Sequence, residues 1–173
     1  MEVQHYTVEA GRLIAGEYPG GHYADVALRR LRTLVEEGVH SFIDLTAPAD
    51  RMEPYAHLLA ELAVATGSSV ELRHFPFPIP DMSVPGSPEL MRGILARLRE
   101  EIAAGRTCYV HCWGGIGRTG TVIACWLRES GMDAHAALAK VQELYAAHMP
   151  KVRLHPKSPQ TDAQVRYVKE WER

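Results

Sequence analysis

The ten residues that decide the fold of this chain are His111-Cys112-Trp113-Gly114-Gly115-Ile116-Gly117-Arg118-Thr119-Gly120. They overlap the run from Thr107 to His111, whose β-branched and aromatic side chains predict a short buried strand. The residues from Thr119 to Glu129 are mostly apolar and predict a buried helix, which Gly131 ends. The stretch is therefore a glycine-rich turn that joins a strand to the N-terminus of a helix.

Such a turn is suited to bind an anion. A helix N-terminus leaves N–H groups without intrahelical partners and carries a partial positive charge. Glycines let successive N–H groups point at one centre, and an arginine adds a planar fork that can bind two oxygens at once. The predicted ligand is a dianionic oxyanion such as phosphate. The residues predicted to bind it are Trp113, Gly114, Gly115, Ile116, Gly117 and Arg118.

Cys112 lies in the same electric field. A helix N-terminus and a neighbouring arginine both stabilise a thiolate, which is the nucleophilic form of cysteine. The sequence thus predicts that Cys112 is an ionised nucleophile. A cysteine and an arginine at this spacing also occur by chance, but the three glycines, the hydroxyl of Thr119 and the strand-turn-helix context argue against coincidence.

The ten residues resemble the phosphate-binding loop of the cysteine-dependent protein phosphatases, HCxxGxGR(S/T)G, and the small size of the chain resembles the dual-specificity branch of that family. The resemblance implies that Cys112 attacks phosphorus to give a phosphocysteine intermediate and that Arg118 clamps the phosphate. It implies a hydrolase that needs no metal and no cofactor. It also implies inhibition by oxyanions such as phosphate or vanadate.

A leaving oxygen departs poorly from phosphorus unless an acid protonates it. Asp81 lies on a proline-punctuated loop, 31 residues before Cys112, and Pro80-Asp81 resembles the acid loop of the phosphatase family. The alternative is an ordinary turn aspartate, which is common beside proline and serine. We expect Asp81 to be the general acid. Ile79 replaces the aromatic residue usual in the family, which predicts weaker anchoring of the closed loop.

Four further residues follow from the resemblance. Thr119 resembles the hydroxyl that stabilises the departing thiolate in the second step, and His111 resembles a histidine that orients the loop through backbone hydrogen bonds. Gln164 is expected to orient the hydrolytic water with help from Gln160, because Gln160-Thr161-x-x-Gln164 resembles a segment of the tyrosine phosphatases. Two glutamines on a solvated helix face are an equally open interpretation.

Strands and helices alternate along the chain. Strands are predicted over Arg12–Ala15, Val39–Leu45, Val70–Phe75 and Thr107–His111. An apolar stripe of Ala27, Leu31, Leu34 and Val35 predicts a helix that ends before Gly38. Two more helices are predicted to begin after N-caps, at Ser87 with Pro88 at N1 and at Ser158 with Pro159 at N1. The other predicted helices are Tyr55–Thr66, Thr119–Glu129 and a segment from Asp133 to about Ala147. This order predicts an α/β three-layer sandwich with a mainly parallel central sheet, which is also the fold that the resemblance implies. The phosphate loop would then lie at the carboxyl end of a strand.

Composition sets the remaining expectations. A chain of 173 residues with 46% hydrophobic residues fits a single catalytic domain over residues 1–173. A net charge of −2 gives no basic excess to favour nucleic-acid binding. Three cysteines make no disulfide framework, and neither a signal sequence nor a membrane-spanning run is evident. We therefore expect a cytoplasmic monomer with neither a nucleic-acid nor a membrane partner.

Several residues have alternative interpretations. A zinc site at Cys108, His111 and Cys112 is disfavoured, because strand alternation puts the histidine opposite the cysteines and a fourth ligand is missing. Cys108 or Cys125 could trap an oxidised Cys112. The basic stretch Lys151, Arg153, His155 and Lys157 is a solvated face or, like Arg51, a site that draws acidic phosphopeptides.

The leading hypothesis is hydrolysis of phosphotyrosine, with phosphoserine and phosphothreonine as an extension, and the substrate is a phosphorylated protein or a small phosphomonoester. One alternative is a phosphatase for inositol phosphates, phosphoinositides or RNA 5′ phosphates. Related enzymes of that kind commonly carry lysines in the loop, where this chain has Trp113 and Ile116. The other alternative is a phosphoresidue-binding module without activity, which the presence of Cys112, Asp81 and Arg118 disfavours.

Overall fold

A computed structural model describes residues 2–67, 69 and 71–172 of the chain. Across these residues a mixed sheet holds five strands: β1 (His5–Glu9), β2 (Leu13–Gly16), β3 (Val39–Asp44), β4 (Arg73–Pro76) and β5 (Thr107–His111). Their order in the sheet is β1-β2-β5-β3-β4. Strand β1 pairs antiparallel with β2, and all other neighbours pair in parallel. The prediction of a mainly parallel sheet is confirmed.

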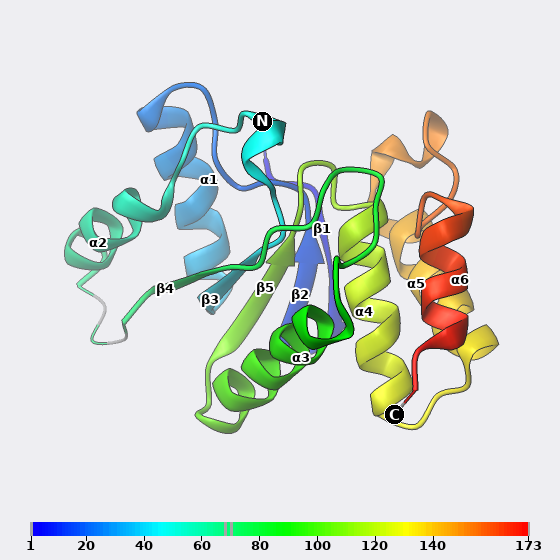
Figure 1. Cartoon of the computed structure of the whole chain (residues 1–173). Coiled ribbons are helices and arrows are strands. Elements are labelled where there is room, and N and C mark those ends of the chain that lie inside the picture. The colour runs from blue at the N-terminus through cyan, green and yellow to red at the C-terminus, as the bar shows by residue number, and fades with distance from the viewer. Residues whose placement is uncertain (1, 68, 70, 173) are drawn as a thin grey trace.

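Helices cover both faces of this sheet (Figure 1). The helices α1 (Ala24–Glu36) and α2 (Ala56–Ala65) lie on one face, and α3 (Pro88–Ala103), α4 (Gly117–Glu129), α5 (Ala134–His148) and α6 (Asp162–Glu170) lie on the other. Two short 3₁₀ helices, η1 (Pro48–Asp50) and η2 (Pro150–Arg153), interrupt the connecting loops. The three-layer α/β sandwich predicted from the sequence is therefore confirmed.

Strand alternation divides the core into two clusters, one on each face of the sheet. Successive residues of a strand point to opposite faces. On β5, Cys108 and Val110 pack in the cluster that contains α3 to α6, whereas Tyr109 packs in the cluster that contains α1 and α2. Cys112 continues the first set. The chain thus delivers Cys112 to the face covered by α4, whose N-terminus follows directly.

Helix capping decides several boundaries. Ser87 caps α3 through a hydrogen bond to Leu90 N–H, with Pro88 at the first helical position, and Asp133 caps α5, as predicted. The prediction that Ser158 caps the last helix is wrong. Thr161 is the N-cap of α6, because its hydroxyl and the Gln164 side chain together form a capping box.

Two strands differ from the sequence prediction. The edge strand β1 is missing from it, since its five residues make a short segment that is only partly buried. Strand β4 begins at Arg73 rather than at Val70, which lies outside the described residues.

Helix α4 begins at Gly117, two residues before the predicted start. None of the described helices is long and apolar enough to cross a membrane.

Four loops converge at one end of the sheet (Figure 1). They follow the carboxyl ends of the parallel strands β2, β3, β4 and β5. Parallel α/β sheets bind ligands at this end. The loop after β5 carries Cys112, the loop after β4 carries Asp81, and the loop after β3 carries η1.

Candidate active site

The phosphate loop runs from Cys112 into the first turn of α4, with Ile116 as the N-cap. Cys112 is 3% exposed. Gly115 has a φ of 71°, a left-handed conformation that favours glycine, and a Cβ there would collide with the backbone of Gly16 and Glu17. The loop is also held by a hydrogen bond from Tyr18 N–H to the Trp113 carbonyl (2.9 Å). The cradle therefore rests directly on the end of β2.

Arg118 is the most buried cation of the site, with 1% of its side chain exposed. Its Nη1 donates to Asp50 Oδ2 at 2.6 Å and to the Ile79 carbonyl at 2.9 Å. Its Nε and Nη2 donate no hydrogen bond among the described residues, although Nη2 lies 3.1 Å from Asp81 Oδ1. One edge of the guanidinium is thus fixed, while Nε and Nη2 keep donors for a bidentate anion.

Asp50 was not identified from the sequence. It ends η1, its side chain is 3% exposed, and its Oδ2 accepts from both Arg118 Nη1 and Ala47 N–H (2.8 Å). Burial by itself lowers the pKa of Arg118, but the charges of Cys112, Asp50 and Asp81 outweigh it and raise that pKa. The guanidinium therefore stays charged. Only the convergence of strand ends in a parallel sheet could have pointed to Asp50.

Asp81 lies at the mouth of the site, with 48% of its side chain exposed. Its Oδ1 accepts from Met82 N–H at 2.9 Å and lies 3.1 Å from Arg118 Nη2. Ile79, for which weaker anchoring of the closed loop is expected, is fully buried; its N–H donates to the Leu45 carbonyl (3.1 Å), and its carbonyl accepts from Arg118. The loop that carries Asp81 is thus tied both to the sheet and to Arg118.

His111 supports the loop from the opposite face of β5. Its Nδ1 lies 3.3 Å from the Cys112 carbonyl, and its Nε2 lies 2.6 Å from Tyr55 Oη. Burial lowers the pKa of His111 to about 4, although Asp44 opposes the shift. The ring is therefore neutral at pH 7. Because a carbonyl can only accept, Nδ1 carries the proton and Nε2 accepts from the Tyr55 hydroxyl.

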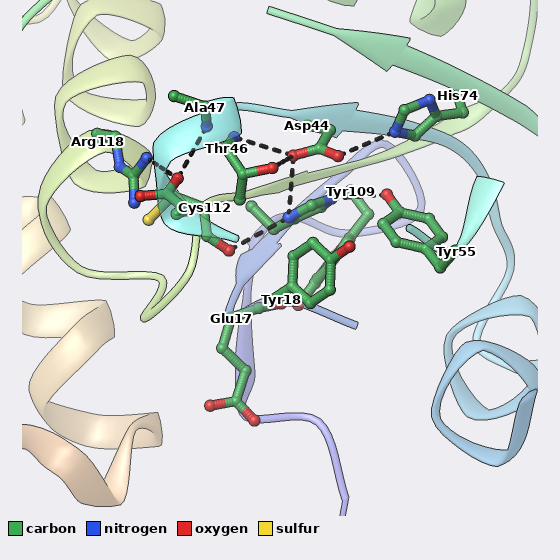
Figure 2. A network of polar contacts seen from close by, with 12 residues as sticks. Glu17, Tyr18, Asp44, Thr46, Ala47, Tyr55, His74, Tyr109, Cys112 and Arg118 are labelled. Atoms are coloured by element: carbon green, nitrogen blue, oxygen red, sulfur yellow. Dashed lines mark hydrogen bonds and ion pairs between the residues drawn. The ribbon is translucent and has the colours of Figure 1, made fainter. Parts of the chain in front are cut away.

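Asp44 organises the polar network behind this histidine (Figure 2). Its Oδ1 accepts from the backbone N–H and the hydroxyl of Thr46 at 2.9 and 2.6 Å, and its Oδ2 lies 3.0 Å from His74 Nε2. Burial raises the pKa of Asp44, but the nearby His111 and these hydrogen bonds lower it overall to about 2. An ionised carboxylate thus links the ends of β3 and β4 beneath the site.

The predicted Thr119 lies in the first turn of α4, and the predicted Gln164 lies in α6 against Gly117. Thr119 is fully buried, and its hydroxyl has no hydrogen-bond partner among the described residues. Gln164 is also fully buried; its Oε1 accepts from Gln160 and Thr161 N–H, and its Nε2 donates to the Ser83 carbonyl (3.1 Å). A Cβ on Gly117 would lie 2.8 Å from either polar atom of Gln164. Gln160 contributes its backbone N–H to these contacts, as the donor to Gln164 Oε1.

Lys151 reaches the phosphate loop from η2. Its Nζ donates to the Gly114 carbonyl at 2.9 Å and to Glu17 Oε2 at 2.6 Å. Arg30 Nη2 donates to the other oxygen of Glu17 at 2.8 Å. The other members of the predicted basic stretch, Arg153, His155 and Lys157, are exposed. The sequence suggested this stretch, but not that one lysine would contact the loop.

The remaining cysteines are far less reactive than a loop cysteine. Burial raises the pKa values of the Cys108 and Cys125 thiols to about 12. Cys108 lies four residues before Cys112, and at the rise of a strand the two Cα atoms are about 13 Å apart, which exceeds the reach of a disulfide. A disulfide between Cys108 and Cys112 would therefore require the backbone to move.

A mainly parallel sheet that presents a cysteine-to-arginine loop at the N-terminus of a buried helix is the arrangement of the dual-specificity and tyrosine phosphatases. Residues 20–132 match the family model "Tc-R-P: Polymorphic toxin system, DSP-PTPase phosphatase". The chain belongs to this family of phosphatases. The family and the enzyme class that the sequence predicted are thereby confirmed.

Known proteins agree with this assignment. The structure is similar to Tk-PTP in its active form, with a TM-score of 0.71 and 27% identity over 96% of this chain and 95% of that chain. It shares its fold with a kinase-associated phosphatase whose catalytic cysteine is replaced by serine (TM-score 0.69, 18% identity, 97% of this chain and 92% of that chain). The phosphatidylglycerophosphate phosphatase PTPMT2 of Arabidopsis thaliana is 33% identical over 107 residues, or 60% of this chain. The chain spans 43% of that relative's length.

Proposed function

We propose that this phosphatase hydrolyses phosphoproteins, with phosphotyrosine first and phosphoserine and phosphothreonine as an extension, through a phosphocysteine intermediate. The observation that carries the proposal is the position of Arg118. Its guanidinium is fixed by Asp50, lies 3.1 Å from Asp81, and keeps Nε and Nη2 free of hydrogen bonds among the described residues. These contacts support Arg118 as the phosphate clamp and Asp81 as the acid beside the loop that holds Cys112.

In the first step the Cys112 thiolate attacks phosphorus. A sulfur–phosphorus bond forms while the bond to the leaving oxygen breaks. Arg118 and the loop N–H groups hold the equatorial oxygens, and Asp81 gives its proton to the leaving alkoxide or phenoxide. The mechanism needs Asp81 protonated and Cys112 ionised at the same time, so the rate should peak on the acid side of neutral.

In the second step water attacks the phosphocysteine. Asp81, now a carboxylate, accepts a proton from the water; the sulfur–phosphorus bond breaks, and inorganic phosphate and the thiolate are released. The hydroxyl of Thr119 is free to donate to the departing sulfur, since it has no partner among the described residues. Gln164 can orient the water only if its amide leaves the backbone groups that it now binds.

The test is turnover of para-nitrophenyl phosphate in the presence of a metal chelator, with a phosphotyrosine peptide as second substrate. Wild-type protein should turn over both, and acid quenching followed by peptide mapping should find phosphate on Cys112. Cys112→Ser should abolish turnover while retaining the melting temperature. Wild-type turnover that requires a metal, or residual turnover by a correctly folded Cys112→Ser, would contradict the mechanism.

A second candidate substrate class is the inositol phosphates, phosphoinositides or RNA 5′ phosphates. The contact between Lys151 Nζ and the Gly114 carbonyl favours it, because it supplies the phosphate loop with a lysine that the loop sequence lacks. The similarity to a phosphatidylglycerophosphate phosphatase points the same way. A cytoplasmic location, a monomeric state and inhibition by vanadate remain predictions.

A further inference from the structure

A hollow with several charged residues in its wall adjoins the phosphate loop. Its volume is about 390 Å³, and it opens between Trp113 and Gly114 of the loop, the segment 17–22 after β2 and the residues 50–53 around the end of η1. Arg30 of α1 and Lys151 of η2 complete its wall. In Figure 2 the Glu17 carboxylate points away from the Asp44–His74 network.

Two cations share one carboxylate in this wall. Glu17 Oε2 accepts from Lys151 Nζ, and Glu17 Oε1 accepts from Arg30 Nη2. These three side chains are between 16% and 19% exposed, so the surrounding protein limits the screening of their charges by water. The cluster carries one positive charge in excess. An ammonium has three donors, and two of those of Lys151 are used.

The other charged groups of the wall are Asp50, Arg51 and Glu53, so its cations and carboxylates balance in number. Asp50 is paired with Arg118, which lies outside the wall. Arg51 and Glu53 are both exposed and offset each other. The pair of Lys151 and Arg30 with its single carboxylate is therefore the locally positive part of the wall beside the phosphate loop.

Trp113 gives the hollow an apolar wall. It follows the nucleophile directly in the chain and is 56% exposed, which is unusual for so large an apolar side chain. Its backbone is fixed by Tyr18, so the ring is attached to a rigid part of the site. A cation cluster and an exposed indole next to a phosphate cradle can hold the leaving group of a substrate between them.

We propose that this hollow is a subsite for a second phosphate on a compact phosphomonoester substrate, with Lys151 and Arg30 as its cations and Trp113 against the body of the leaving group. Gly114 is two residues from Cys112, so the two phosphates would lie on the order of 10 Å apart. This inference rests on the proposed phosphatase function and favours the second of its two candidate substrate classes. The substrate is a small bisphosphate, either free or as a lipid headgroup.

The experiment compares KM values for inositol 1,4-bisphosphate and inositol 1-phosphate. In wild-type protein the bisphosphate should have the lower KM. Lys151→Met should raise the ratio of the two KM values, bisphosphate over monophosphate, about tenfold, which is the loss of one charge-assisted contact. Lys157→Met, an exposed lysine of the same segment, should leave the ratio unchanged.

Glu17→Gln distinguishes a subsite from a purely structural link between η2 and the loop. It removes the carboxylate that neutralises the cluster, so it should lower the same ratio, opposite to Lys151→Met. If both variants move the ratio in the same direction, or leave it unchanged, the subsite is overturned. The two KM values are compared within one variant, so a general loss of activity caused by breaking the Lys151–Glu17 contact does not change their ratio.

Three further measurements separate the remaining outcomes. Vesicles that contain a bisphosphorylated phosphoinositide, compared with the free headgroup, distinguish the lipid from the soluble source. A selective effect of Lys151→Met on an acidic phosphotyrosine peptide, with none on the bisphosphate, would replace the compact ligand by a peptide and overturn the proposal. Absence of wild-type turnover of para-nitrophenyl phosphate would instead reject the proposed function itself.

Discussion

Arg118 and Asp50, which are 68 residues apart in the chain, form a buried ion pair of 2.6 Å between Nη1 and Oδ2. The pair joins the phosphate clamp on α4 to the short helix η1 after β3. It leaves Nε and Nη2 of Arg118 for the substrate, so Asp50 orients the clamp without competing for the same donors. We therefore expect Asp50 to act as a positioning residue.

Asp50→Asn keeps the shape of the side chain but removes its charge. We expect kcat/KM for para-nitrophenyl phosphate to fall about tenfold to a hundredfold, since misplacement of a clamp by about 1 Å has costs of this size. The inhibition constant of vanadate should rise in parallel, and Asp50→Glu should recover part of both. Asp25→Asn, on an exposed carboxylate of α1, is the matched control. An unchanged vanadate constant in a folded Asp50→Asn would show that Asp50 does not act through Arg118.

Asp81→Asn removes the proposed proton donor. The kcat for a phosphoserine peptide, whose alkoxide is a poor leaving group, should fall about 10²–10⁴-fold, and the fall should be smaller for para-nitrophenyl phosphate. The decline of the rate on the alkaline side of the optimum should also disappear. Equal losses for the two substrates would mean that Asp81 acts only as the ion-pair partner of Arg118.

His111 should make stability depend on pH. Burial holds its pKa at about 4, below the ordinary 6.5, so the unfolded chain binds more protons between these values. Stability is then fully present above pH 6.5 and is lost as pH falls toward 4, by about 3 kcal/mol in total. Denaturant unfolding at pH 7, 5.5 and 4.5 measures this loss. His111→Asn should flatten the dependence, whereas His155→Asn, on an exposed histidine, should retain it.

Gln164 has two possible roles that one pair of variants can separate. Both Gln164→Ala and Thr161→Ala break the capping box of α6 and should cost about 1 kcal/mol of stability. Gln164→Ala alone should also slow hydrolysis of the phosphocysteine, seen as accumulated intermediate and a larger burst. If the two variants show equal kinetics, Gln164 serves only the cap and its contact with Ser83.

The local parts of the structure could be predicted from the sequence. Cys112, Arg118 and the glycines between them belong to one continuous segment, and Ser87 and Asp133 cap helices whose first turns directly follow them. The cap at Ser158 was misplaced because Ser-Pro fits the same pattern, whereas the hydroxyl of Ser158 donates to the Ile116 carbonyl at 2.7 Å. Ser158 and Thr161 both fit the local pattern of an N-cap, and tertiary packing decides which of them caps α6.

The distant parts could not be predicted in this way. Asp50, Tyr55 and Lys151 reach the site from segments whose position depends on the order of strands in the sheet. The Tyr55–His111 bond joins residues 56 positions apart, and the Lys151–Glu17 bond joins residues 134 positions apart. Nothing in the local composition of these segments records such a pairing, so the supporting residues appear only once the topology is known.

The contact between Gln164 and Ser83 ties α6 to the loop that carries Asp81. Helix α6 touches the first residue of α4 at Gly117 and holds the acid loop through the Ser83 carbonyl. We therefore expect truncation before residue 158, or a fusion partner that displaces α6, to slow turnover even where the sheet remains folded.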